Sequence, residues 1–184
     1  SSVSGEVIAV EDRPLATGRR ALAVVIRNDG NDDMVKFETG DLDKMSPDVI
    51  RQKVKAAGIV GMGGAGFPAH IKLNPPKPVD TILINGAECE PYLTCDHRLM
   101  VERAPQVVGG LLAIMKATGA SRGIIGIEEN KPDAIMQMQD ATQDQDHLSV
   151  AVLKVKYPQG AEKQLIKAIL DKEVPSGCLP ADVG

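Results

Sequence analysis

The chain has 184 residues, of which 43% are hydrophobic, so it suits one domain, or one domain with a small appendage, and can build a core. Its formal net charge at pH 7 is −4 and its Lys and Arg are scattered, which excludes the basic surface of a nucleic-acid-binding protein. No apolar run is long enough to span a bilayer, and the first residues lack the pattern of a signal peptide.

The first part of the chain has the pattern of a small β unit. Residues 3–10 and 21–26 carry short β-branched apolar runs, separated by a polar turn with Pro and Gly. Residues 27–44 are polar and acidic and are typical of a linker. We therefore expect two domains, 1–38 and 39–184. Because the chain starts at Ser1 without a methionine, we also expect it to be part of a longer protein.

A helix with clear end signals follows the linker. Ser46 is a suitable N-cap, Pro47 suits the first helical position and Gly58 suits the position past the end, which predicts a helix over 47–57. This helix leads to a glycine-rich run over residues 61–68, Gly-Met-Gly-Gly-Ala-Gly-Phe-Pro.

The glycine-rich run is a candidate phosphate-binding loop. Gly61, Gly63, Gly64 and Gly66 leave backbone N–H groups open to an anion, and residues 67–73 read as the first turns of a helix. Lys72 in those turns would add a positive charge. The run matches neither the P-loop nor the dinucleotide fingerprint, and a tight packing turn is the alternative.

Strands and helices alternate after residue 78. The expected strands are 79–84, 123–127 and 148–155, and the expected helices are 96–101, 104–118, 132–143 and 159–170. This alternation predicts an α/β fold, a parallel sheet with helices on both faces. Ligands of such sheets bind beyond the carboxyl ends of the strands. We expect the polar loops that follow the strands to form one cleft with the glycine-rich run.

Several side chains in these loops are candidates for binding or chemistry. The amide of Asn85 could bind the edge of a planar heterocycle. Glu88 and Glu90 share one side of an extended segment and could accept from ribose or ring donors, or they could form a solvated acidic loop. Tyr157 could flank a planar ring or cap the core.

The cysteines give no sign of a metal site. The chain has three cysteines, Cys89, Cys95 and Cys178, and none of them has C-x-x-C spacing. An odd number without this spacing argues against a disulfide framework and against a four-cysteine cluster. We expect no metal bound by this chain, and a reducing compartment.

Four segments taken together resemble a known family. They are residues 61–72, 85–91, 127–132 and 156–165, and they resemble the C subunit of the Rnf electron-transport complex, the ion-translocating oxidoreductase complex. The match spans nearly the whole chain. That subunit is in turn similar to the FMN- and NADH-binding subunit of respiratory complex I, whose corresponding motifs read G-R-G-G-A-G-F-P and N-A-D-E-S-E-P.

The resemblance implies a Rossmann-like FMN- and NADH-binding domain preceded by the end of a β barrel-sandwich. It implies an NADH:acceptor oxidoreductase that transfers hydride between NAD(H) and FMN and passes electrons to 4Fe-4S clusters outside these 184 residues. The FMN phosphate and ribityl chain would face Gly61, Gly63, Gly64, Gly66 and Lys72. The ring would lie near Asn85, Glu88, Tyr157 and Gly160, and NADH near Phe67, Glu90 and Glu162. The candidate catalytic residues are Glu88, Glu90 and Tyr157.

The resemblance also implies partners and a location. The partners would be NADH and the other Rnf-type subunits, with the chain peripheral at the cytoplasmic side of the inner (plasma) membrane. A cobalamin reductase built on the same scaffold and a non-catalytic docking scaffold without flavin are two alternatives. FMN binding separates the last of these from the others.

Overall fold

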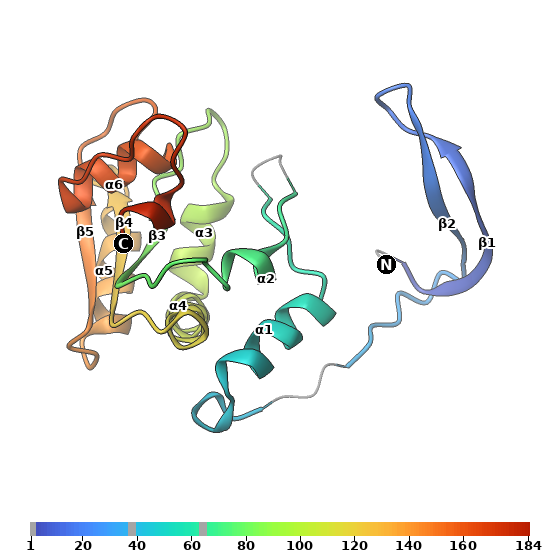
Figure 1. The fold of residues 1–184 in the computed structure, drawn as a ribbon, viewed down its shortest axis with the longest axis horizontal. Coiled ribbons are helices and arrows are strands. Elements are labelled where there is room, and N and C mark those ends of the chain that lie inside the picture. Colours follow the sequence, from blue (N-terminus) through green and yellow to red (C-terminus); the bar gives the residue numbers. More distant parts are fainter. Residues whose placement is uncertain (1–2, 37–39, 63–65) are drawn as a thin grey trace. The chain divides into compact units, whose positions relative to one another are not determined.

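A computed structural model describes residues 3–36, 40–62 and 66–184 (Figure 1). The chain divides into two compact units, residues 1–40 and 41–184. The first unit holds an antiparallel hairpin of β1 (Gly5–Pro14) and β2 (Arg20–Asn28). The two expected strands are confirmed, and both are longer than their apolar runs because backbone pairing continues through polar residues such as Glu11 opposite Ala23.

The second unit begins with a 3-10 turn, η1 (Leu42–Lys44), and with the expected helix, α1 (Pro47–Ala56). The Ser46 side chain accepts a hydrogen bond from the Val49 amide, as the N-cap signal predicts. Ile50 is buried against Leu73 and Ala117. This contact fixes α1 against the rest of the unit and so fixes the start of the glycine-rich run.

The sheet of the second unit is parallel, as expected. Its strands are β3 (Thr81–Gly86), β4 (Arg122–Glu128) and β5 (Leu148–Leu153), in the order β3-β4-β5. Helices α3 (Cys95–Glu102) and α4 (Ala104–Thr118) connect β3 to β4, α5 (Pro132–Thr142) connects β4 to β5, and α6 (Glu162–Leu170) follows β5. The pairing brings the carboxyl ends of all the strands to one edge of the sheet.

Helices cover both faces of this sheet, which confirms the expected fold class. On one face, Ile125 and Ile127 are fully buried with Leu111 of α4 and Met138 of α5. On the other face, α6 packs over Gly126, where a Cβ would lie 2.9 Å from Ile169 Cδ1. A side chain at this position would push α6 off the sheet.

Several element boundaries differ from the expected ones: β3 spans Thr81–Gly86 rather than 79–84, and the end of β5 and the start of α6 also differ. Strand β5 ends at Leu153 rather than at residue 155, because Leu153 pairs with Glu128, the last residue of its partner β4. Helix α6 begins at Glu162 rather than at residue 159, because residues 156–160 form a turn closed by the Gln159 amide donating to the Lys156 carbonyl at 2.8 Å. The result is a longer loop at the edge of the sheet where ligands are expected.

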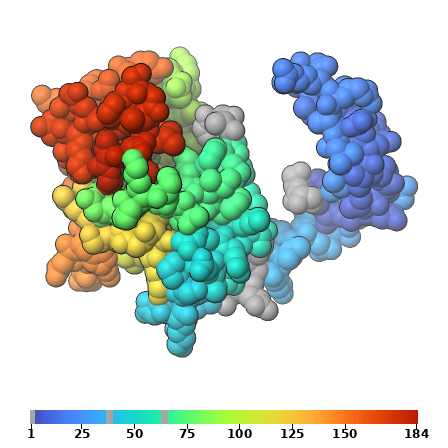
Figure 2. Space-filling view, viewed as in Figure 1, coloured from blue at the N-terminus to red at the C-terminus, as the bar shows by residue number. Residues whose placement is uncertain are grey.

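The last residues of the chain lie against the segment that precedes β3. The 3-10 turn η2 (Pro180–Asp182) is tied to Lys77, whose Nζ lies 2.8 Å from Asp182 Oδ1. Figure 2 shows these carboxyl-terminal residues, in red, next to the green segment that contains Lys77. Within the described ranges, the structure contains no helix with the length and apolar character of a membrane span.

The core predicts a large effect for one methionine and a small effect for its neighbour. Met138→Ala removes a side chain that is 0% exposed, and we expect it to lower the free energy of unfolding by about 2–5 kcal/mol. Met136→Ala, in the same helix but 54% exposed, should change it by less than about 0.5 kcal/mol. Urea unfolding measures both. Equal losses in the two variants would contradict the assigned faces of α5.

Candidate functional site

The loops after β3 and β5 meet at the carboxyl edge of the sheet. Asn85 Nδ2 donates to the Gly160 carbonyl oxygen at 2.7 Å, and Asn85 Oδ1 accepts from the Ala87 amide at 3.2 Å. The amide of Asn85 therefore uses both its donor and its acceptor to hold protein backbone. This explains an Asn at the end of a strand, where the side chain links the chain leaving β3 to the chain leaving β5.

Gly160 and Cys89 complete this junction. A Cβ at Gly160 would overlap the Ala87 carbonyl oxygen and would crowd Cys89 Sγ at 3.2 Å, so the close approach of the two loops requires glycine. The Gly160 amide donates to Cys89 Sγ at 2.9 Å. The thiol of Cys89 is thus a backbone partner inside the junction.

Glu88 holds the start of α3. Its Oε1 accepts from the Asp96 amide at 2.9 Å and its Oε2 accepts from the His97 amide at 3.4 Å. These are among the N–H groups that a helix leaves unpaired at its start, and a carboxylate there also gains from the helix dipole. The candidate catalytic carboxylate of Glu88 is therefore engaged as a helix cap.

The same cap explains a small cluster of polar atoms. The thiol of Cys95 and one carboxylate oxygen each of Glu88 and Asp96 lie within 4.8 Å of one another. Partial desolvation, together with the negative charges of Asp96 and Glu88, raises the pKa of the Cys95 thiol. A raised pKa disfavours the thiolate, so Cys95 is a poor candidate for a nucleophile.

The glycine-rich run is closed at its base. The Gly61 amide donates to the Phe67 carbonyl oxygen at 2.8 Å, and Val60 and Pro68 form an antiparallel bridge. Gly66 has φ +60°, in the left-handed region that glycine adopts without strain. Gly63 and Gly64 lie outside the described residues, so their expected phosphate contacts stay predictions.

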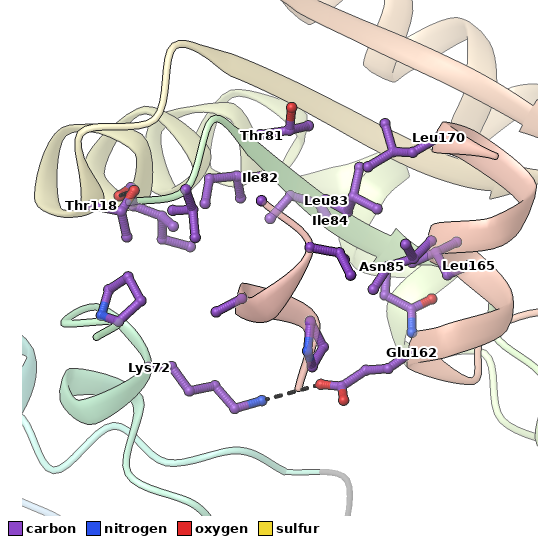
Figure 3. A pocket seen from close by; sticks show the side chains of 18 of the residues that line it. Lys72, Thr81, Ile82, Leu83, Ile84, Asn85, Thr118, Glu162, Leu165 and Leu170 are labelled. Carbon is purple, nitrogen blue, oxygen red and sulfur yellow. Dashed lines mark hydrogen bonds and ion pairs between the residues drawn. The ribbon is translucent and has the colours of Figure 1, made fainter. Parts of the chain in front are cut away.

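A cavity of about 520 Å³ lies along the outer edge of β3 (Figure 3). It is lined by side chains of β3, by α2 (Ala69–Lys72), by α6 and by η2. Three of the expected site residues line it, namely Lys72, Asn85 and Glu162. Lys72 Nζ and Glu162 Oε1 are 3.6 Å apart, and both side chains are more than half exposed. The volume is in the range of small-molecule and cofactor pockets, about 300–1,000 Å³.

The other described residues of the expected site lie outside the lining of this cavity, namely Gly61, Gly66, Phe67, Glu88, Glu90, Tyr157 and Gly160. Phe67, Glu90 and Tyr157 are all exposed, and the exposed fraction of Tyr157 is 74%. Tyr157 does not cap the core. These side chains are available to a ligand that approaches from solvent.

Sequence reasoning missed a buried pair of charges at the end of β4. Glu128 is 3% exposed and Lys131 is 7% exposed, and Glu128 Oε2 lies 3.5 Å from Lys131 Nζ. In the sequence this segment is only one of the polar loops that follow the strands. The sequence does hold one signal for this pair. Glu128 directly follows the apolar strand residues 123–127, and Lys131 comes three residues later.

Comparison with known proteins identifies relatives among C subunits of ion-translocating oxidoreductase complexes. The C subunit of the Na(+)-translocating ferredoxin:NAD(+) oxidoreductase complex of Acetobacterium woodii is 54% identical over 188 residues, covering 100% of this chain and 42% of the relative. The C subunit of the proton-translocating ferredoxin:NAD(+) oxidoreductase complex of Clostridium ljungdahlii is 46% identical, covering 100% of this chain and 41% of the relative. The C subunit of the ion-translocating oxidoreductase complex of Pseudomonas aeruginosa is 40% identical, covering 98% and 24%. The expected resemblance is confirmed, and the chain spans less than half the length of these relatives.

A solved structure and a family model agree with this result. The fold is similar to a crystal structure of an NAD+-reducing NiFe-hydrogenase in the H2-reduced state, with a TM-score of 0.57 and 26% identity over 68% of this chain and 26% of that chain. The model of the Nuo51 FMN-binding domain matches residues 54–184. This match covers most of the chain, which therefore belongs to the Nuo51 FMN-binding domain family.

Proposed function

We propose that this chain binds FMN and transfers hydride between NAD(H) and FMN, as the flavin-binding part of an electron-transfer subunit in an ion-translocating membrane complex. One observation carries the proposal. A cavity with Lys72 and Asn85 in its wall lies at the edge of the sheet in a chain that matches an FMN-binding domain.

The chemistry of the residues fits FMN. Lys72 offers a cation to the phosphate, and an exposed ion pair such as Lys72–Glu162 is weak enough for a phosphate to replace it. The apolar side chains of β3 and α6 in the cavity wall suit a planar ring. When bound, FMN supplies hydride acceptance and single-electron release, while the protein supplies position and field.

The backbone of the glycine-rich run would complete the phosphate and ribityl contacts. We assign this role to the glycines of the run, Gly61, Gly63, Gly64 and Gly66. The support is the geometry at the base of the run, where the Gly61–Phe67 hydrogen bond brings the two ends together. Successive backbone N–H groups in a turn can form an anion-binding concavity.

The candidate catalytic residues have different roles in this proposal. The carboxylate of Glu88 is engaged with the amides of α3, so we propose that it positions the loop that carries Glu90. Glu90 and Tyr157 are exposed, and we assign them to contacts with the reactants. Asn85 and Gly160 shape the site through their mutual hydrogen bond.

NAD(H) is the proposed hydride partner. The names of two relatives and of the similar hydrogenase include NAD(+) as an acceptor. Phe67, Glu90 and Glu162 are all exposed, so a dinucleotide can meet them without entering the apolar part of the cavity. A carboxylate accepts well from ribose hydroxyls, and an aromatic ring stacks well on adenine.

The proposed partners are the other subunits of such a complex. The relatives are named as C subunits of Na(+)-translocating and ion-translocating oxidoreductase complexes. We place this chain as a peripheral part on the cytoplasmic side of the inner (plasma) membrane. The 4Fe-4S clusters that would accept the electrons would be bound outside these 184 residues.

FMN titration of the purified chain tests the flavin site. We expect the wild-type chain to bind FMN, and we expect Lys72→Ala to raise the Kd about 10- to 100-fold, because it removes a charge-assisted contact to the phosphate. Lys53→Ala, an exposed lysine on α1, is the matched control and should leave the Kd within about twofold. Quenching of flavin fluorescence measures all three. Equal affinity of the Lys72 and Lys53 variants would move the phosphate away from Lys72.

Glu162→Gln should have the opposite effect on the same titration. The variant frees Lys72 from its ion pair and removes a carboxylate that repels the phosphate. Since an exposed pair is worth about 0.2–1 kcal/mol, we expect the FMN Kd to fall about two- to fivefold. A higher Kd would show that Glu162 contributes to the flavin site by another contact.

Anaerobic addition of NADH to the FMN-loaded chain tests hydride transfer. We expect the visible flavin absorbance to bleach, and we expect Glu90→Gln to raise the NADH concentration for half-maximal bleaching about fivefold without changing the FMN Kd. Glu102→Gln, an exposed carboxylate on α3, is the control. FMN binding without any bleaching would reject NADH oxidation by this chain, and no FMN binding would favour a docking scaffold.

A further inference from the structure

The charged side chains that are buried among the described residues are Glu128 and Lys131. They lie at the carboxyl end of β4, and their side chains are 4% and 9% exposed. Lys131 Nζ also lies 3.2 Å from Asn130 Oδ1. Neither residue lines the cavity beside β3. The proposed function has so far given them no role.

Stability alone does not explain this pair. Removing two charges from water costs several kcal/mol, and buried ion pairs can often be replaced by apolar residues without loss of stability. Glu128 makes one further contact that an apolar residue could not make. Its Oε1 accepts a hydrogen bond from the Lys156 amide at 3.3 Å. The pair therefore connects the end of β4 to the backbone after β5.

This contact lies at the start of the turn formed by residues 156–160. The end of the same turn is held by Asn85 and Cys89, which bind the carbonyl and the amide of Gly160. Between these points, Gln159 is 2% exposed and its Nε2 donates to the Lys154 carbonyl oxygen at 3.1 Å. The turn is thus fixed at both ends, while the side chain of Tyr157 stays exposed.

We propose that Glu128, with its charge balanced by Lys131, is a positioning residue that holds the Tyr157–Gly160 turn at the flavin site. This inference rests on the proposed function, in which the turn lies near the flavin ring. Glu128 acts through the Lys156 amide and touches neither FMN nor NADH. Lys131 Nζ lies 3.5 Å from Glu128 Oε2, while Oε1 of the same carboxylate accepts from the Lys156 amide.

Two double variants isolate the hydrogen bond from the ion pair. Glu128→Gln with Lys131→Met removes both charges and keeps an acceptor for the Lys156 amide. Glu128→Met with Lys131→Met removes both charges and the acceptor. The midpoints of thermal unfolding of the two variants should agree within about 4 °C, because both replace the pair with side chains of similar size.

The first readout needs no flavin. Hydrogen exchange of the Lys156 amide, measured by NMR relative to the Ile125 amide in β4, should be about tenfold faster in the Met/Met variant than in the Gln/Met variant. The second readout is FMN affinity, and we expect the Kd of the Met/Met variant to be at least about fivefold higher. A wild-type chain that binds no FMN would reject the proposed function, while the exchange rates would still decide how the turn is held.

Two results would overturn the inference. Equal exchange of the Lys156 amide in the two variants would show that Glu128 does not hold the turn. Faster exchange with unchanged FMN affinity would show that the held turn is not part of the flavin site. If the Met/Met variant does not fold, Glu128→Asp replaces it. The shorter acid keeps the charge beside Lys131, but its carboxylate is one methylene further from the Lys156 amide, so the same faster exchange is expected.

Discussion

The position of β4 between β3 and β5 is the constraint on which the second unit depends. Every residue of β4 after Arg122 is buried. Gly123 and Gly126 face opposite sides of the strand, and a Cβ at either one would lie 2.9 Å from an apolar side chain of a covering helix. Helices α4 and α6 can therefore approach the strand from both sides. Parallel pairing on both edges of β4 then places three loops at one end of the sheet.

At that end of the sheet, several polar side chains are already hydrogen-bonded to main-chain groups and are not free for a ligand. The side chains of Asn85, Glu88 and Glu128 each accept from or donate to a main-chain group of another loop or helix. Loops rarely pack by apolar contacts alone, because their backbone groups need partners. The groups left for a ligand are therefore the exposed ones around this junction, such as Lys72 and Glu90.

Local signals predicted the elements better than the contacts between them. The cap at Ser46 acts over a few residues, and α1 lies within a residue of its expected range. Val155 continues the apolar pattern of β5, but the strand stops at Leu153 because β4 offers no further partner.

In the candidate site, too, local motifs were more informative than contacts between distant segments. Three residues predicted from their motifs do line one cavity, namely Lys72, Asn85 and Glu162. The cap formed by Glu88 and the burial of Glu128 could not be predicted, because an acidic residue in a polar loop looks the same whether it is solvated or bound to a distant amide.

The Lys72–Glu162 pair also has a kinetic consequence. A cation and an anion 3.6 Å apart largely cancel each other's field at a distance, so this part of the cavity wall attracts an approaching anion only weakly. Attraction begins when the ligand is close enough to distinguish the two charges, well inside the Debye length of about 10 Å at 0.1 M salt. Long-range steering therefore contributes little here, and the rate of anion capture by this cavity will depend on the encounter itself more than on ionic strength.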